Sequence, residues 1–242
     1  MQAVLQQHPT TTAPASQTGQ SGTLLELAGI TKIYNAGQEN AFQALKGIDL
    51  VIEKGEFVAI MGPSGSGKST LMNILGALDV PSSGTYTLRG VNVEGLSENQ
   101  LAEFRNQDVG FVFQRFNLLP RLSVMENVLL PALYGDLPDA EARALQLLGQ
   151  VGLESKSANM PNQLSGGEMQ RIAIARALIM QPSIIMADEP TGNLDTKTSE
   201  EIMSLFREIH EQGNTVILIT HEDDIAANAR RVINIRDGRV VP

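Results

Sequence analysis

A glycine-rich segment of this chain has the residue types and the spacing that bind the phosphates of a nucleotide. It reads Gly62-Pro63-Ser64-Gly65-Ser66-Gly67-Lys68-Ser69-Thr70, and its glycines let the backbone wrap closely and turn amides toward phosphate oxygens. Lys68 would reach the β- and γ-phosphates, and the hydroxyl of Ser69 would ligate Mg²⁺. A plain glycine-rich turn is the alternative, but the segment follows an apolar run and precedes a helical pattern, which favours a phosphate-binding loop.

Ser165, Gly166 and Gly167 form a second candidate phosphate-binding element. They open a helix expected to run to about Met180, and the N-terminus of such a helix favours a negative phosphate. A glycine loop with a serine N-cap is the alternative. One nucleotide does not need two such elements from one chain, so the pair indicates that two copies of the chain share each nucleotide.

Two adjacent acids follow the apolar run 184–187 and therefore sit at the C-terminal end of a predicted strand, where ligands gather in open α/β sheets. Asp188 is expected to hold Mg²⁺ through its water shell. Glu189 is the natural general base to orient and polarise an attacking water. The alternative is that both acids merely cap the next turn.

In their order along the chain, these motifs resemble those of the ATP-binding subunits of ABC (ATP-binding cassette) transporters. The resemblance implies that ATP is the nucleotide and that Ser165-Gly166-Gly167 closes over the γ-phosphate held by the opposing subunit. Gln114, which follows the strand-like run 110–113, matches the family's glutamine loop. Its side chain would contact Mg²⁺ or the water, although a lone glutamine after a strand is usually structural.

The same resemblance gives roles to three more residues. His221 ends the run 216–220 and occupies the place of a histidine that contacts the γ-phosphate, although a lone histidine is more often structural. Tyr34 sits where the family stacks an aromatic ring on adenine, and simple packing is the alternative. Asp195 lies in the loop that crosses the dimer interface, and it is equally suited to cap the next helix; both can hold together.

Composition narrows the class of protein. Of 242 residues, 42% are hydrophobic and 19% charged, which is ordinary for a soluble globular chain. The absence of cysteine excludes disulfides and thiolate metal sites. A net charge of −9 opposes a dedicated nucleic-acid binder, and we expect no nucleic acid as a partner. No window approaches the roughly 20 apolar residues that span a bilayer, so any membrane connection would run through a partner.

Periodicity predicts an α/β fold with a parallel core. The first 22 residues lack Lys and Arg and are expected to be a disordered tail, followed by one ABC ATPase domain over 23–242. A helical subdomain over about 97–161 interrupts the core, with capping boxes beginning at Ser97 and Ser123. The resemblance implies a P-loop NTPase (RecA-like) core with an added antiparallel β subdomain. Strands are expected at 24–34, 45–52, 57–61, 84–90, 110–113, 184–187 and 216–220, and helices at 68–78, 140–149 and 199–212.

Three segments, Leu71–Gly76, Phe113–Pro120 and Ala187–Asp195, are similar to a bacterial group that includes lipoprotein-release and macrolide-export ATPases. Members of that group resemble mechanotransmitters, in which closure in the cytoplasm moves periplasmic parts of a permease. The resemblance therefore implies an ATPase that forms a homodimer around two ATP·Mg²⁺ and drives a separate integral membrane permease in export. It would act at the cytoplasmic face of the inner membrane. An ATPase that regulates a cell-envelope complex without transport, and a clamp on nucleic acid or ribosomes, remain as alternatives.

Overall fold

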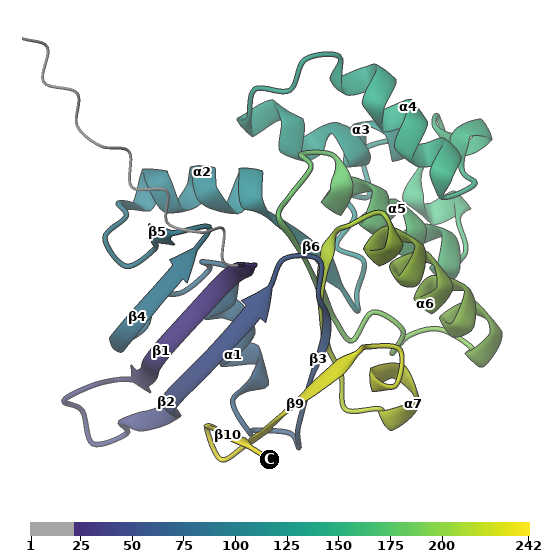
Figure 1. The fold of residues 1–242 in the computed structure, drawn as a ribbon. Coiled ribbons are helices and arrows are strands. Elements are labelled where there is room, and N and C mark those ends of the chain that lie inside the picture. The colour runs from purple at the N-terminus through teal and green to yellow at the C-terminus, as the bar shows by residue number, and fades with distance from the viewer. Residues whose placement is uncertain (1–21) are drawn as a thin grey trace, which may run out of the picture.

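Two β-sheets of different kinds organise the part of the chain that the computed structural model describes, residues 22–242 (Figure 1). The predicted tail, residues 1–22, lies outside the described residues except for Gly22. Among residues 22–242, no helix is long and apolar enough to cross a bilayer.

The larger sheet has six strands in the order β10-β9-β3-β8-β7-β6. Its central strands pair in parallel, and β10 closes one edge antiparallel to β9. The predicted short apolar runs are confirmed as strands buried on both faces, as expected for a parallel sheet covered on each side. The bounds are β3 Phe57–Met61, β6 Val109–Phe113, β7 Ile184–Asp188, β8 Thr215–Ile219, β9 Arg231–Arg236 and β10 Arg239–Val241.

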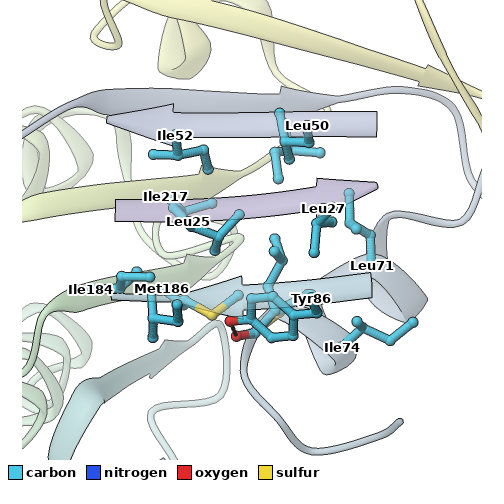
Figure 2. Close-up of a cluster of buried hydrophobic side chains, with 14 of the residues drawn as sticks. Leu25, Leu27, Leu50, Ile52, Leu71, Ile74, Tyr86, Ile184, Met186 and Ile217 are labelled. Carbon is cyan, nitrogen blue, oxygen red and sulfur yellow. Dashed lines mark hydrogen bonds between the residues drawn. The ribbon is translucent and has the colours of Figure 1, made fainter. Parts of the chain in front are cut away.

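The smaller sheet is antiparallel and has the order β2-β1-β4-β5. Its strands are β1 Thr23–Tyr34, β2 Phe42–Glu53, β4 Ser83–Leu88 and β5 Val91–Asn92. One face of this sheet packs over helix α1, Lys68–Leu75, and over one face of the parallel sheet, and the side chains of all three interdigitate in one cluster (Figure 2).

The parallel sheet separates two hydrophobic clusters because side chains alternate along each strand. In β7, Ile184 and Met186 pack in the cluster shared with the antiparallel sheet, whereas Ile185 and Ala187 pack in the cluster beneath the helices. Tyr86 is fully buried in the first cluster, and its hydroxyl donates to the carbonyl of Leu75 at 2.6 Å. Burial raises the pKa of this phenol far above its ordinary value.

Helices gather on the side of the parallel sheet away from the antiparallel sheet (Figure 1). They are α3 Val124–Leu129, α4 Ala140–Gln150, α5 Gly166–Leu178, α6 Thr196–Glu211 and α7 Asp223–Ala226. Short 3₁₀ turns lie at Leu130–Tyr134, Glu154–Lys156 and Pro161–Gln163. Helix α2, Glu98–Asp108, lies apart from them, near β4 and β5. The box at Ser123 is confirmed, since Ser123 Oγ accepts from the amide of Glu126 and Glu126 Oε2 accepts from the amide of Ser123. At Ser97, Gln100 Oε1 accepts from the amide of Ser97.

The structure corrects two predicted helix boundaries. Within the stretch 97–161, the strand predicted at 110–113 is confirmed as β6, which belongs to the parallel sheet. Helix α1 ends at Leu75 rather than near Leu78, since Ala77 has a left-handed φ of 52° that no helix continues. Helix α6 begins at Thr196 rather than Ser199.

Candidate functional site

The glycine-rich segment forms the connection between β3 and α1, as predicted. Gly62 and Gly67 have φ of 151° and 107°, and both pass close to backbone. A Cβ at Gly62 would lie 2.0 Å from the carbonyl oxygen of Ile235, and one at Gly67 would lie 2.9 Å from that of Ala44. Only glycine fits at these two positions, so the loop packs directly against the backbone of β9 and β2.

A pocket of about 920 Å³ lies over this loop at the carboxyl edge of the parallel sheet. It joins the loop to residues from the ends of three other strands, which is where open α/β sheets bind ligands. The lining residues are Phe42, Ala44, Met61, Gly62, Pro63, Ser64, Gly65, Gly67, Lys68, Ser69, Thr70, Gln114, Asp188, Glu189, Ile219, His221 and Asn234.

Lys68 points back onto the loop that precedes it. Its Nζ donates to the carbonyl oxygens of Gly62 at 2.6 Å and Pro63 at 3.0 Å. These bonds hold the ammonium at the pocket, where phosphate oxygens would compete for the same protons.

Glu189 and His221 are joined at the pocket wall. His221 Nδ1 donates to Glu189 Oε1 at 2.6 Å, and the buried hydroxyl of Thr220 donates to Glu189 Oε2 at 3.2 Å. The hydrogen bond and then the charge of Glu189 raise the pKa of His221. Glu189 has a left-handed φ of 45°, and its amide donates to the carbonyl of Ile219 at 2.9 Å. The carboxylate is therefore fixed from both its backbone and its side chain.

Asp188 ends β7 beside Glu189. Burial, and then the charge of Glu189, raise the pKa of Asp188, while Lys68 lowers it. A bound divalent cation would offset the cost of ionising this carboxyl. Ser69, Asp188 and Gln114 line the same pocket with a hydroxyl, a carboxylate and an amide, which are the oxygen donors that Mg²⁺ takes. This donor set fits Mg²⁺.

Gln114 follows β6 and contacts the loop after Glu189. The side chain of Asn193 donates to the carbonyl of Gln114 at 2.9 Å. A Cβ at Gly192 would lie 2.6 Å from Gln114 Nε2, so the glutamine packs directly against that glycine.

Tyr34 does not line the pocket. Its hydroxyl lies 3.2 Å from Asp79 Oδ2, as donor, and 3.5 Å from the hydroxyl of Thr70. Phe42, its partner across the β1–β2 pair, lines the pocket and is 59% exposed. The sequence reasoning did not select Phe42. The adenine-stacking role of Tyr34 stays a prediction.

The second phosphate element lies in a different pocket, of about 430 Å³, which Asp195 also lines. Ser165 caps α5, with its Oγ accepting from the amide of Glu168 at 3.3 Å. Lys156 pairs with Glu168, and this hydrogen bond is the largest cause that lowers the pKa of Glu168. Asp195 caps α6 by accepting from the amide and hydroxyl of Thr198 at 3.1 and 2.6 Å, as one of its two predicted roles requires. Neither Ser165-Gly166-Gly167 nor Asp195 lines the first pocket.

Comparison with known proteins finds relatives of this chain over most of its length. The family model described as "ABC transporter" matches residues 45–192. The macrolide export ATP-binding/permease protein MacB of Chlorobaculum tepidum is 55% identical over 219 residues, 90% of this chain and 34% of that protein. The chain thus spans about a third of the length of this relative. The uncharacterized ABC transporter ATP-binding protein YvrO of Bacillus subtilis is 53% identical over 220 residues, 90% of this chain and 96% of that one.

A solved structure shares the fold. The ATP-binding cassette MJ0796, as a dimer in a post-hydrolysis state bound to ADP and Pi, superposes with a TM-score of 0.81 at 44% identity, covering 90% of this chain and 97% of that one. The predicted α/β cassette fold, a parallel core with an antiparallel sheet, is therefore confirmed.

Proposed function

This chain belongs to the ABC transporter family, and on that premise we propose that it is the ATP-hydrolysing subunit that drives a separate membrane permease. The observation that carries the proposal is the single pocket in which the phosphate loop faces Asp188, Glu189 and His221. The supporting relatives are ATP-binding transporter proteins, and the solved neighbour holds ADP and Pi.

The geometry supports a direct attack of water on the γ-phosphate. Glu189 orients the water and takes its proton as the oxygen–phosphorus bond forms and the bond to the β-phosphate bridging oxygen breaks. His221 and Thr220 hold the carboxylate of Glu189 in place. Lys68 exchanges its loop carbonyls for phosphate oxygens and stabilises their charge. Mg²⁺, held by Ser69, Asp188 and Gln114, would neutralise charge on the phosphates.

In this proposal, the second phosphate element binds the nucleotide that is held by the phosphate loop of another copy. Ser165-Gly166-Gly167 lies in a pocket of its own, so a helix N-terminus is left facing away from the chain's own phosphate loop. Two copies placed head to tail would each complete the other's site with these amides. The solved neighbour is a dimer of cassettes, which supports a homodimer around two ATP.

The relatives' names support the proposal of a membrane partner. MacB is named as a macrolide export protein with both ATP-binding and permease parts, and this chain matches about a third of it. We therefore place the chain at the cytoplasmic face of the inner membrane, bound to an integral permease that carries out export or mechanotransmission. Contacts to the transported substrate would lie in that permease.

The first test is the Glu189→Gln variant. Removing the general base should leave ATP binding intact and lower the hydrolysis rate by about 100-fold or more, while a closed dimer accumulates with ATP. Size-exclusion chromatography with and without ATP, beside a hydrolysis assay, measures both effects. Near-normal hydrolysis in this variant would reject Glu189 as the base.

The partner is tested by purifying the tagged Glu189→Gln chain with ATP from detergent-solubilised membranes, followed by mass spectrometry. Recovery of an integral membrane protein with a large periplasmic domain supports the export or mechanotransmission role. Recovery of a cell-envelope enzyme complex without a transporter would favour regulation instead. Recovery of ribosomal or nucleic-acid-associated proteins alone would reject the transporter assignment.

A further inference from the structure

A buried side chain on α5 holds the loop that follows Glu189. Gln170 is fully buried, and its Nε2 donates to the carbonyl oxygen of Pro190 at 2.8 Å. Pro190 is the residue after Glu189, whose φ of 45° lies in the left-handed region. The hydrogen bond therefore fixes the Pro190–Thr191 peptide, one residue beyond the candidate general base.

The first turn of α5 also packs against the same loop. A Cβ added at Gly166 would lie 3.3 Å from Cδ2 of Leu194, and one at Gly167 would lie 2.5 Å from Cγ2 of Thr198. Leu194 lies in the loop over residues 190–195, whereas Thr198 lies in α6. The first turn of α5 is therefore packed against both the loop and the start of α6, and a displacement of the helix N-terminus would press on both.

Gln170 is a polar residue in a buried position that an apolar side chain could fill equally well by packing alone. Its Oε1 is buried without a hydrogen-bond partner among residues 22–242. The hydroxyl of Thr191, the residue that follows Pro190, is also buried without a partner among these residues. A buried acceptor without a partner carries a free-energy cost, which an apolar side chain of the same size would avoid. The amide donor is the feature of Gln170 that the loop uses.

We propose that Gln170 is a positioning residue that ties Glu189 to the helix whose first turn serves the nucleotide of the partner copy. This inference rests on the proposed function. Helix α5 begins next to Ser165, in the second phosphate site, whereas Glu189 acts in the first site of the same chain. When α5 closes on the partner copy's ATP, Gln170 carries the displacement to Pro190, so hydrolysis at one site depends on occupancy of the other.

The Gln170→Met variant tests the tie, because methionine nearly matches glutamine in size and cannot donate. In the full chain, the Kd for ATP should stay within about threefold of wild type. The kcat should fall by about 10- to 100-fold, the loss expected when a catalytic group is misplaced by about an ångström. The Hill coefficient of hydrolysis against ATP concentration should fall toward 1.

The Gln170→Glu variant adds a readout that a purely structural role would not move. Burial raises the pKa of a carboxyl, so at low pH the introduced group is protonated and its O–H can donate to the Pro190 carbonyl. At high pH it is ionised, has no proton to donate and repels that carbonyl. The kcat of Gln170→Glu relative to wild type should therefore rise as pH falls, while the same ratio for Gln170→Met should stay flat.

Ile174→Val is the matched control. Ile174 is fully buried on the same helix and offers no polar contact, so its truncation should lower thermal stability slightly and leave kcat and the Hill coefficient unchanged. Wild-type kcat in Gln170→Met, or a Gln170→Glu ratio that does not change with pH, would overturn the inference. If Gln170→Met does not fold, the pH dependence of kcat in Gln170→Glu relative to wild type tests the inference by itself. A wild-type chain that does not hydrolyse ATP would reject the proposed function, and this inference with it.

Discussion

At the residue scale, each of the two candidate phosphate-binding elements has a hydrogen-bonded polar pair beside it. In the first pocket, Glu189 accepts from His221 Nδ1, and this hydrogen bond is the largest cause that raises the pKa of His221. At the start of α5, Lys156 pairs with Glu168 and lowers the pKa of that carboxyl. Each pair can be tested by removing one member.

The titration of His221 should depend on Glu189. The midpoint for its imidazole should lie above the ordinary value of about 6.5 in the wild-type chain and fall in Glu189→Gln. A raised folded-state pKa adds stability below about pH 6.5, and this is lost as pH rises through the folded value. This contribution to the free energy of unfolding is small because the side chain of His221 is exposed. NMR titration without nucleotide measures the midpoint, and equal midpoints in the two proteins would contradict the pairing.

The charge of Lys156 should matter for ATP-driven dimerisation. Glu168 places a negative charge in the first turn of α5, where the phosphate of the other copy would bind, and Lys156 neutralises it. In a Glu189→Gln background, Lys156→Met should raise the ATP concentration for half-maximal dimerisation by about 2- to 5-fold. Adding Glu168→Gln should restore it. Analytical ultracentrifugation measures the effect, and no change in Lys156→Met alone would contradict it.

Local patterns predicted the positions of the phosphate loop and of Asp188 and Glu189, because a strand, a turn and a helix are adjacent in sequence there. Gln170, Lys156 and Phe42 were given no role from the sequence, for a physical reason. Gln170 meets Pro190 twenty residues away, and Phe42 reaches the pocket only because the antiparallel sheet folds over the core. Such contacts depend on tertiary packing and leave no periodic signal in the sequence. The functional roles of all these residues remain predictions.

Helices α5 and α6 contact each other at their N-terminal turns, and this contact positions the Ser165-Gly166-Gly167 segment. Gly167 faces the methyl group of Thr198, which is the residue that Asp195 caps. The same tight fit occurs at the other end of α5, where a Cβ at Gly110 of β6 would lie 2.4 Å from the carbonyl of Ala177. Glycines thus let α5 lie close to its neighbours at both ends.

Gly167→Ala should destabilise the fold, because the new methyl would overlap Thr198 Cγ2 at 2.5 Å. Overpacking of this kind costs about 1–3 kcal/mol, which corresponds to a Tm lower by about 2–10 °C for a chain of this size. Thr198→Ser removes the methyl and keeps the capping hydroxyl, so the double variant should recover most of the Tm. Differential scanning calorimetry measures this. If Thr198→Ser gives no recovery in the double variant, the clash is elsewhere.

The element boundaries show where sequence reasoning stops. The strand at 57–61 was predicted to the residue because four of its five side chains are buried and the run is bounded by turns. Helix α6 began earlier than expected, since the cap at Asp195 outweighs the weak helix propensity of the threonines after it. The strand at 110–113, within the helical stretch, was predicted to within one residue, because its apolar run is short and ends at a polar glutamine.

At the scale of the whole molecule, the two candidate phosphate-binding elements line different pockets of one chain. A site completed by a second copy predicts complementation between defective chains. Ser165→Arg blocks only the second element, and Glu189→Gln disables only the first pocket. A mixed dimer of the two variants would carry one intact site and one doubly damaged site.

Equal amounts of Ser165→Arg and Glu189→Gln chains, mixed before ATP is added, should therefore regain hydrolysis: about a quarter of wild type if the two sites act independently, and less to the extent that the working site depends on closure of the damaged one. Half of the dimers are mixed, and each of these has one working site of two. Each variant alone should remain near background. Hydrolysis that stays at background after mixing, while ultracentrifugation shows that dimers form, would mean that each chain builds its site alone.

A lineage that inherits this chain can change strands β3, β7 and β8 by substitution far more readily than by gaining or losing a residue. One inserted residue in β7 would turn side chains such as Ile184 and Met186 toward the opposite cluster and move Asp188 relative to Lys68 on the phosphate loop. Exchange of one apolar side chain for another leaves that order intact. Changes in length should therefore be accommodated more easily in the connecting loops than in the strands.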